Sequence, residues 1–399
     1  MKKDFKATVM KNFTFNSKTL FFIFVVFAML LSFPSCFDMY SDIKENSNIN
    51  YKIAILESTP METRLLIPDS NKIYSKNLSF NPIYFGSSTF QFSLFGKFTK
   101  NSYLNIVVLR ITMPGYYYPE LWTCDKNFNF IKTDLTYIDS SGLSDAIADD
   151  FDNNGMADIA IVTGAGYINR CFLNIASPEN FSSITFGTYA PSVCIASADF
   201  DNDGYRDIFA GTISSGVDSS ALWKNDIHSS GTFQKTYSIY TPNLKDCKAA
   251  DFDNDGRSDI VLVYNGGPIQ VLFNSGNFSF NYNWLSSLSY NATKVAVADL
   301  NGDNLPDICL ITSIGTIIAF NNGNRTFTVK ELAIPETADD VALADFDGDG
   351  DIDLFLPSLT AGTFNIYKND SQGNFSFSQS VTSISGGPYN NISVGAYSN

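Results

Sequence analysis

Histidine and cysteine are scarce in this chain, with one histidine and six cysteines in 399 residues. The lone His228 excludes a metal centre with several histidines, and no Ser-His-Asp or Cys-His arrangement is suggested around it. Once Cys36 is set aside, an odd number of cysteines remains, without paired spacing. The sequence therefore predicts neither a zinc site nor a disulfide framework, and Cys309, inside an apolar run, is expected to be a small buried hydrophobic residue.

Basic residues are also few, because 26 lysines and arginines face 41 aspartates and glutamates, for a formal net charge of −15. Such a balance repels phosphate backbones, so nucleic acid is not expected as a partner. An apolar fraction of 44% and a charged fraction of 17% are typical of a globular protein with a sizeable core. Aspartates that cluster at fixed spacing indicate cation sites.

The first 36 residues are interpreted as an export signal. Five lysines precede the apolar run Leu20–Leu31, whose twelve residues are too short to cross a bilayer as a helix. Ser35 then stands directly before Cys36, as at a bacterial lipoprotein processing site; in the alternative, cleavage falls nearby and Cys36 is an ordinary residue. We expect a flexible tether over 37–50 and the folded domain over 51–399. The protein is expected at the cell surface, outer membrane or periplasm, with any membrane contact through a lipid at Cys36.

An Asp-rich motif of nine residues repeats five times along the chain. The five copies align without gaps, and their first aspartates lie 49, 52, 48 and 46 residues apart. The copies are Asp150–Asp158, Asp199–Asp207, Asp251–Asp259, Asp299–Asp307 and Asp345–Asp353. A repeat of about 50 residues indicates a solenoid, a propeller or an array rather than an ordinary mixed fold.

Two weaker copies extend the array. Lys97–Asn105 keeps the phenylalanine and the following apolar strand, 53 residues before Asp150, but has lost the carboxylates. At the other end, Ile392–Asn399 matches the strand and loop that begin at Val341. These copies bring the number of repeat positions to seven.

Each repeat carries the pattern of four short antiparallel strands, which is the unit of a propeller blade. We therefore predict an all-β fold, a seven-bladed β-propeller of four-stranded blades. The last copy ends after one strand, and Tyr51–Leu56, Thr63–Ile67 and Leu78–Tyr84 offer three more. The simplest closure has the N- and C-terminal strands sharing one blade. A six-bladed ring with a separate N-terminal element is the alternative.

The spaced DxDxDGxxD loops resemble the FG-GAP and VCBS repeats of the integrin α-subunit propeller and of many bacterial surface proteins. The resemblance covers residues 51–399 and implies a calcium-binding propeller. No Gly-Ala-Pro follows the loops, where the chain instead has segments such as Ala160–Thr163. The chain is thus more similar to the bacterial variety, and integrin-type ligand recognition is not implied.

The loop chemistry predicts up to five Ca²⁺ ions, because calcium takes six to eight oxygen ligands and a tight turn can present alternate side chains to one centre. Position 7 is expected to contribute its backbone carbonyl. The predicted ligands are Asp150, Asp152, Asn154, Met156 and Asp158; Asp199, Asp201, Asp203, Tyr205 and Asp207; Asp251, Asp253, Asp255, Arg257 and Asp259; Asp299, Asn301, Asp303, Leu305 and Asp307; and Asp345, Asp347, Asp349, Asp351 and Asp353. An EF-hand is excluded, because position 12 is never glutamate.

Asp, Asn and Gly clusters also form metal-free turns, but four carboxylates in one turn would repel each other without a cation. We expect structural rather than catalytic calcium. The loop at Asp299 should bind most weakly, because Asn301 replaces an aspartate and Asn304 replaces the turn glycine. The copy at Lys97 should bind none.

Strand direction places the turns after the second strands and the connections between blades on the face opposite the Asp-rich loops. Tyr116, Tyr117 and Tyr118 are candidate ligand contacts in a loop on that face. The sequence thus favours a cell-envelope binding module for adhesion, protein or glycan recognition, and not an enzyme. A structural subunit of an envelope complex, or a glycan-degrading propeller enzyme, is the alternative.

Overall fold

Short antiparallel strands make up nearly all of the regular structure, as the β-branched runs predict. The computed structural model describes residues 51–398 apart from 59–62, 67–90, 100–103, 114–115, 125–129, 136–142, 165, 176–180, 188, 214–218, 286–289, 333, 335–337, 348, 359–362 and 383–390. The predicted export signal, the tether and Cys36 lie within 1–50 and so outside the described residues.

Six sheets have four strands each, and each follows the chain order from its first strand to its fourth. The first three blades are β3 (Gln91–Phe95), β4 (Leu104–Met113), β5 (Tyr116–Cys124) and β6 (Phe130–Asp134); β7 (Leu143–Asp149), β8 (Asp158–Thr163), β9 (Asn169–Asn174) and β10 (Phe181–Phe186); and β11 (Ser192–Ala198), β12 (Asp207–Thr212), β13 (Ser220–Asp226) and β14 (Thr232–Ile239). The next three are β15 (Leu244–Ala250), β16 (Asp259–Tyr264), β17 (Ile269–Asn274) and β18 (Phe280–Leu285); β19 (Ala292–Ala298), β20 (Asp307–Thr312), β21 (Gly315–Asn321) and β22 (Phe327–Glu331); and β23 (Ala342–Ala344), β24 (Asp353–Ser358), β25 (Thr363–Asn369) and β26 (Phe375–Thr382).

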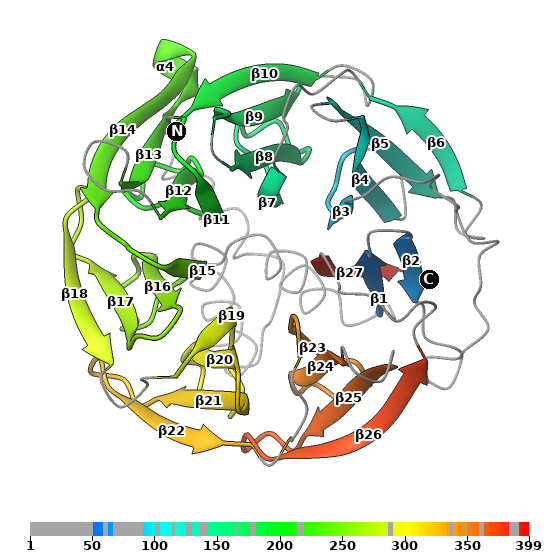
Figure 1. Cartoon of the computed structure of the whole chain (residues 1–399), viewed down its shortest axis with the longest axis vertical. Helices are drawn as coiled ribbons and strands as arrows, with labels where there is room; N and C mark the ends of the chain where they lie inside the picture. Colours follow the sequence, from blue (N-terminus) through cyan, green and yellow to red (C-terminus); the bar gives the residue numbers. More distant parts are fainter. Residues whose placement is uncertain are drawn as a thin grey trace, which may run out of the picture.

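The blades surround a central axis, with the first strand of each blade innermost and the fourth on the outer rim (Figure 1). Each Asp-rich loop joins an inner strand to the second strand of its blade. The second strands β8, β12, β16 and β20 are buried along their whole length, as their uninterrupted apolar runs predict. All five loops therefore lie at one end of the ring.

The prediction of seven four-stranded blades is wrong. The structure has six such blades, and the chain ends form a separate sheet of three strands, β2 (Thr63–Leu66), β1 (Tyr51–Ser58) and β27 (Asn391–Ser398). The terminal strands do pair, from Tyr51 opposite Ser398 to Ser58 opposite Asn391. The two ends supply only these three strands among the described residues, and the third N-terminal candidate, Leu78–Tyr84, lies outside them. This sheet lies in the ring between the sixth and the first blade (Figure 1).

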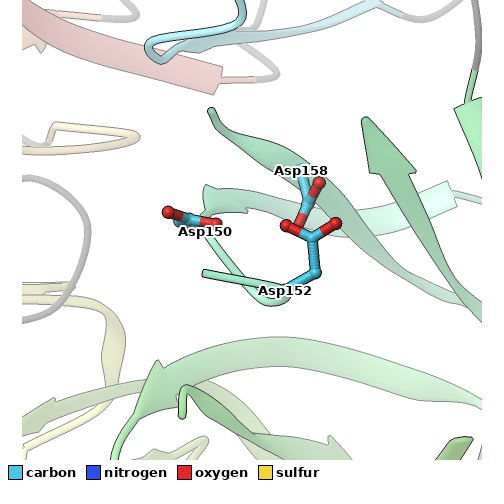
Figure 2. Close-up of side chains that lie close together, drawn as sticks. All are labelled: Asp150, Asp152 and Asp158. Atoms are coloured by element: carbon cyan, nitrogen blue, oxygen red, sulfur yellow. The ribbon is translucent and has the colours of Figure 1, made fainter. Parts of the chain in front are cut away.

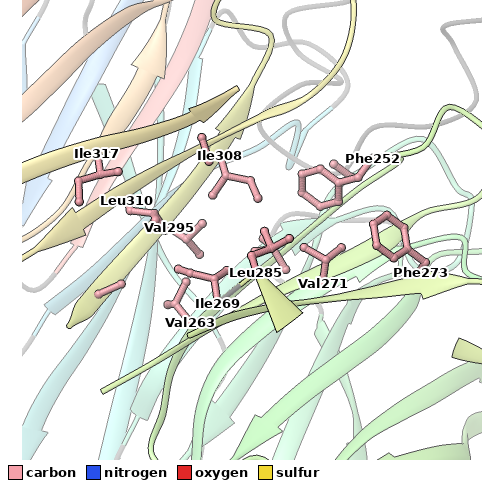
Figure 3. Close-up of a cluster of buried hydrophobic side chains, with 14 residues drawn as sticks. Phe252, Val263, Ile269, Val271, Phe273, Leu285, Val295, Ile308, Leu310 and Ile317 are labelled. Atoms are coloured by element: carbon pink, nitrogen blue, oxygen red, sulfur yellow. The ribbon is translucent and has the colours of Figure 1, made fainter. Parts of the chain in front are cut away.

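The hydrophobic core lies between blades rather than inside them. A single cluster joins the fourth blade, through Phe252, Val271 and Phe273, to the fifth, through Ile308 and Leu310 (Figure 3). These side chains are almost fully buried, and similar clusters lie between the other described blades. Because a blade buries its apolar faces only against its neighbours, the ring is stable as a unit.

The prediction that the cysteines form no disulfide is wrong for one pair. Cys194 of β11 and Cys247 of β15 form a disulfide between the inner strands of the third and fourth blades, with their Cα atoms 5.9 Å apart. Gly211, opposite Cys194 in the sheet, leaves room for the bridge, since a Cβ there would lie 2.4 Å from the Cys194 sulfur. An odd cysteine count misled the prediction because Cys171 and Cys309 stay free and buried, Cys309 as expected.

Replacing Cys194 and Cys247 together by alanine should lower the free energy of unfolding by about 2–4 kcal/mol, because the bridge restricts the unfolded chain. Urea melts of the variant and the unchanged protein measure the difference. The matched control is Cys171→Ala, which removes a buried thiol without a bridge. A reductant in the melt should abolish the difference between the double variant and the unchanged protein, and equal midpoints without reductant would contradict the disulfide.

Candidate functional site

The first aspartate of each loop organises the turn. In the loop at Asp199, its two carboxylate oxygens accept the backbone N–H groups of Asp203 and Gly204 at 3.0 and 2.8 Å. The first aspartates of the other four loops accept the same pair of N–H groups, at positions 5 and 6. The side chain of the first aspartate thus bonds the backbone four and five residues further on, which closes the turn and fixes its carboxylate before any ligand binds.

Position 6 has a left-handed backbone in every loop. Glycine occupies it in four loops, with φ between 82° and 102°, and Asn304 occupies it in the fifth, with φ of 66°. The expectation that Asn304 must adopt the strained conformation is thus confirmed. The position-7 residues follow directly, and their N–H groups donate to the side chain at position 5. The turn thereby holds the backbone of position 7 against the side chain at position 5.

Carboxylates gather in four of the five loops. In each of these loops three aspartates offer oxygens that all lie within 4.8 Å of one another. Figure 2 shows the first group, with Asp152 and Asp158 facing each other and Asp150 beside them. The groups are Asp150, Asp152 and Asp158; Asp199, Asp201 and Asp203; Asp251, Asp253 and Asp255; and Asp345, Asp347 and Asp353. Among the described residues, the loop at Asp299 does not bring three acidic side chains this close.

The third position of two loops fits a hard cation. Asp201 Oδ1 and Asp253 Oδ1 are buried oxygens that accept no hydrogen bond within the described part of the chain. A buried carboxylate oxygen without a partner is costly, and Ca²⁺ prefers oxygen ligands of this kind. The residues present therefore suit calcium in these two loops. A metal ion would be held by the carboxylates at positions 1, 3, 5 and 9 together with the position-7 carbonyl.

Basic side chains lie at the edges of the same loops. Lys224 contacts Asp201 and Asp203, with a distance of 2.6 Å to Asp203 Oδ2. Arg325 Nη2 lies 2.7 Å from Asp253 Oδ2, and Lys368 Nζ lies 2.5 Å from Asp347 Oδ2. Each cation offsets part of the repulsion between carboxylates, so these loops can persist without a metal.

The ninth-position aspartate is the most buried acidic residue of each loop, with no exposed surface in any of the five. Its Oδ2 accepts the N–H of position 2, as in Asp259 and Phe252, where the distance is 2.9 Å. Burial raises the pKa of Asp158, Asp307 and Asp353 to about 7 and that of Asp207 and Asp259 to about 8. Neighbouring aspartates raise these pKa values further, and backbone N–H donors lower them.

The other oxygen of this aspartate binds an asparagine at the end of the third strand, a contact we call the clasp. In the fourth blade the N–H of Asn274 donates to Asp259 Oδ1 at 2.7 Å. The side-chain amide of Asn274 then donates to Ser258 O in its own loop and to Phe200 O in the loop of the preceding blade, at 3.1 and 2.8 Å. One asparagine thus joins two consecutive loops.

The clasp recurs in five blades and connects all six. The asparagines are Asn174, Asn225, Asn274, Asn321 and Asn369, and each donates to the position-2 carbonyl of the loop before it. Asn174 donates to Phe98 O of the degenerate copy, which therefore keeps this structural role without acidic residues. Successive loops are also joined directly. Asn153 donates to Gly204 O of the next loop at 2.8 Å, and Asn202 donates to Gly256 O of the loop after that at 3.3 Å.

Sequence reasoning missed the clasp, although a signal was present. An asparagine is the last residue of the third strand in the second, fourth, fifth and sixth blades and the next-to-last in the third, 14 to 18 positions after the ninth-position aspartate. Asparagine is depleted in strands, so its recurrence at one place in a repeat indicates a specific hydrogen bond.

Other predicted residues lie elsewhere. Tyr116, Tyr117 and Tyr118 are not loop residues, because they begin β5 and pair with Met113, Ile111 and Arg110 of β4. Strand pairing there extends almost to the turn, which the aromatic, proline-flanked sequence did not reveal. His228 belongs to the short helix α4 (Ile227–Ser230) and lies against Tyr205, with ring centroids 5.0 Å apart.

The fold and the loops define a β-propeller built from Asp-loop repeats, and comparison with known proteins identifies the repeat. The family model for the FG-GAP-like repeat matches residues 116–210 and 251–310. These stretches are FG-GAP-like repeats, which confirms the resemblance drawn from the loops. A T-cell immunomodulatory protein homolog of Plasmodium falciparum is 29% identical over 153 residues, a match that covers 32% of this chain and 21% of that protein.

Solved structures share the fold at low sequence identity. An Agrocybe aegerita lectin that recognises non-reducing terminal N-acetylglucosamine matches with a TM-score of 0.62 and 17% identity, over 87% of this chain and 95% of the lectin. A periplasmic gluconolactonase of Pseudomonas aeruginosa matches with a TM-score of 0.59 and 10% identity, over 86% of this chain and 99% of the enzyme. At these identities the likeness shows the propeller fold alone.

Asn274→Ala should lower the free energy of unfolding by roughly 2–4 kcal/mol, because it removes three hydrogen bonds, namely the two that its amide donates to Ser258 O and Phe200 O and the one that its Oδ1 accepts from Gly276 N. Thermal or urea melts give the change. The control in the same blade is Asn281→Ala, an exposed residue whose amide contacts Ser275 Oγ, and it should change stability by less than about 0.5 kcal/mol. Equal losses of stability in the two variants would mean that the clasp makes no specific contribution to the free energy of unfolding.

Proposed function

We propose that this protein is an exported, calcium-stabilised binding module of the cell envelope, which recognises a protein or glycan through the face opposite the Asp-rich loops. The observation that carries the proposal is the position of the five loops, all at one end of the ring. The loops and the clasps at that end hold the blades together. The turns after the second strands and the connections between blades are left at the other end for recognition.

The calcium part of the proposal is supported by the donor set. Three carboxylates converge in four loops, and the Oδ1 atoms of Asp201 and Asp253 are buried without a hydrogen-bond partner. Calcium in such a loop would be saturated by oxygen ligands, and its role would be structural. The loop at Asp299 should bind most weakly, since Asn301 and Asn304 replace an aspartate and a glycine and its carboxylates lie further apart.

The proposal that the protein binds a ligand, and does not catalyse a reaction, is supported by the fold and by the positions of His228, Asp145 and Asp246. The only histidine, His228, stacks on Tyr205 at the loop end. At the axis, Asp145 Oδ2 and Asp246 Oδ2 accept the N–H groups of Ile195 and Val295 in the next blade, so these two acids join inner strands. We therefore propose binding rather than catalysis, in keeping with a fold shared by a lectin.

The proposal that the protein is exported is supported by a disulfide inside the ring. The buried disulfide between Cys194 and Cys247 requires an oxidising compartment to form and persist, such as the periplasm or the cell exterior. Among the described residues, no helix is long and apolar enough to cross a membrane. We propose that the protein reaches the envelope through its basic and apolar N-terminal segment and is anchored there by a lipid on Cys36.

The binding role is tested by surface plasmon resonance with the purified protein over immobilised envelope proteins and over immobilised glycans, in millimolar calcium and in chelator. We expect saturable binding to one of the two surfaces in calcium and weaker binding in chelator, because a looser ring positions its turns less well. Absence of binding to both surfaces in calcium would contradict the proposed function and favour a purely structural role.

Calcium should raise the melting temperature, because a ligand that binds only the folded state stabilises it by about 2.7 kcal/mol for each site at a hundredfold excess over Kd. Differential scanning calorimetry in calcium and in chelator measures the shift. Asp201→Asn should reduce the shift more than Asp303→Asn, since the Asp299 loop binds more weakly. An identical melting temperature in calcium and chelator would refute the metal assignment.

A further inference from the structure

One junction between blades departs from the repeat. Ser192 begins the inner strand of the third blade, where the second, fourth and fifth blades have Leu143, Leu244 and Ala292 in the same register. Ser192 is 1% exposed, and Leu244 and Ala292 are equally buried in their own blades. A buried hydroxyl in place of an apolar packing residue costs stability, so this departure indicates a local role other than packing.

A small pocket lies at this junction, between the second and third blades, which stand side by side in the ring (Figure 1). Neutral polar side chains line it, namely Asn169, Ser192, Thr212 and Ser219, and the indole of Trp223 lines it as well. Asn169 Nδ2 donates to Ser192 Oγ at 3.0 Å and so joins the two blades across the pocket. Gly187 keeps the space open, because a Cβ there would lie 2.8 Å from Asn169 Nδ2.

Exposed aromatic and aliphatic side chains follow pocket residues closely along the chain, at the end of the ring opposite the Asp-rich loops. Tyr189 lies two residues after Gly187 and is 68% exposed, and Ile213 follows Thr212 and is 46% exposed. The backbone next to Tyr167 is joined to that of Tyr189, because Gly166 N donates to Tyr189 O at 3.2 Å. The N–H of Ile213 donates to Pro191 O at 3.3 Å, so the loops of the two blades are joined at the rim.

We propose that this junction is a carbohydrate-binding site, in which one sugar unit lies against the Tyr189 ring and directs a hydroxyl or hydroxymethyl group into the pocket. Hydroxyl and amide groups above an aromatic surface match the chemistry of a sugar, which has one polar edge and one apolar face. The space open to a water-sized group is about 10 Å³, which admits a single hydroxyl, so the rest of the sugar would lie outside the pocket against the surface.

A sugar fits this surface better than a protein partner does. A stable protein interface needs a patch of about 800 Å² on each partner with a continuous apolar core. Here the exposed apolar groups are single side chains around a polar depression, and the groups inside it are small and neutral apart from Lys235, whose ammonium group lies 6.0 Å from the Trp223 ring centroid. The assignment rests on the proposed binding function and names its ligand class and its residues.

The test is an array of immobilised neutral oligosaccharides built from glucose, galactose, mannose, fucose and N-acetylglucosamine, followed by calorimetry with the tightest hit. Tyr189→Ala should weaken binding about tenfold or more, whereas Tyr189→Phe should retain it, since the ring face makes the contact. Ser192→Leu should abolish binding by filling the pocket and should lower the melting temperature, because it removes the hydroxyl that accepts the buried Asn169 amide, whereas Tyr189→Ala, at a side chain 68% exposed, should leave the melting temperature unchanged. The matched control is Tyr282→Ala, a tyrosine 65% exposed on the outer strand β18.

Absence of binding to every sugar on the array would overturn the carbohydrate site. Binding that survives both Tyr189→Ala and Ser192→Leu unchanged would place the sugar elsewhere and overturn it as well. An equal loss of sugar binding in Tyr282→Ala would show that the effect of Tyr189→Ala is nonspecific, and it would also contradict the carbohydrate site. Binding to immobilised envelope proteins but to no sugar would support the proposed function and contradict the carbohydrate site. Binding to neither would contradict both.

Discussion

The clasp between a buried aspartate and a strand-end asparagine is the interaction on which the ring depends. The aspartate closes its own loop by accepting the position-2 N–H and holds the asparagine by accepting its backbone N–H. The asparagine amide then donates to the preceding loop, so that a local turn becomes a bond between blades. Because all three groups are fully or nearly fully buried, leaving any one unpaired would cost more than the bond itself contributes.

This arrangement separates the structural role of the loops from metal binding. The degenerate copy has no acidic residues in its loop, yet Phe98 O accepts the amide of Asn174 as its counterparts do in other blades. Burial among other carboxylates disfavours the charged form of the ninth-position aspartates and so raises their pKa. A calcium ion would favour the charged form and relieve that repulsion, and Lys224 and Arg325 offset part of it in the metal-free ring.

Much of this structure could be predicted from the sequence because it repeats. Five aligned loops located the strands on either side of them, and the turn at Asn304 followed from backbone sterics. Features that depend on contacts between repeats could not be read in the same way. The three-stranded closing sheet depends on how many strands the two chain ends contribute, and the Cys194–Cys247 bridge depends on two inner strands being adjacent. Tyr116 was assigned to a loop because its aromatic neighbours do not reveal where strand pairing stops.

The central claim is that the clasps make the blades a single cooperative unit, and native-state hydrogen exchange tests it most directly. The backbone amides of Asn174, Asn225, Asn274, Asn321 and Asn369 each donate to a buried aspartate. If the clasps unite the ring, these five amides should exchange with one common opening free energy, equal to that of global unfolding. Opening free energies that differ from blade to blade and fall well below the global value would show that the blades open independently, and would contradict the account.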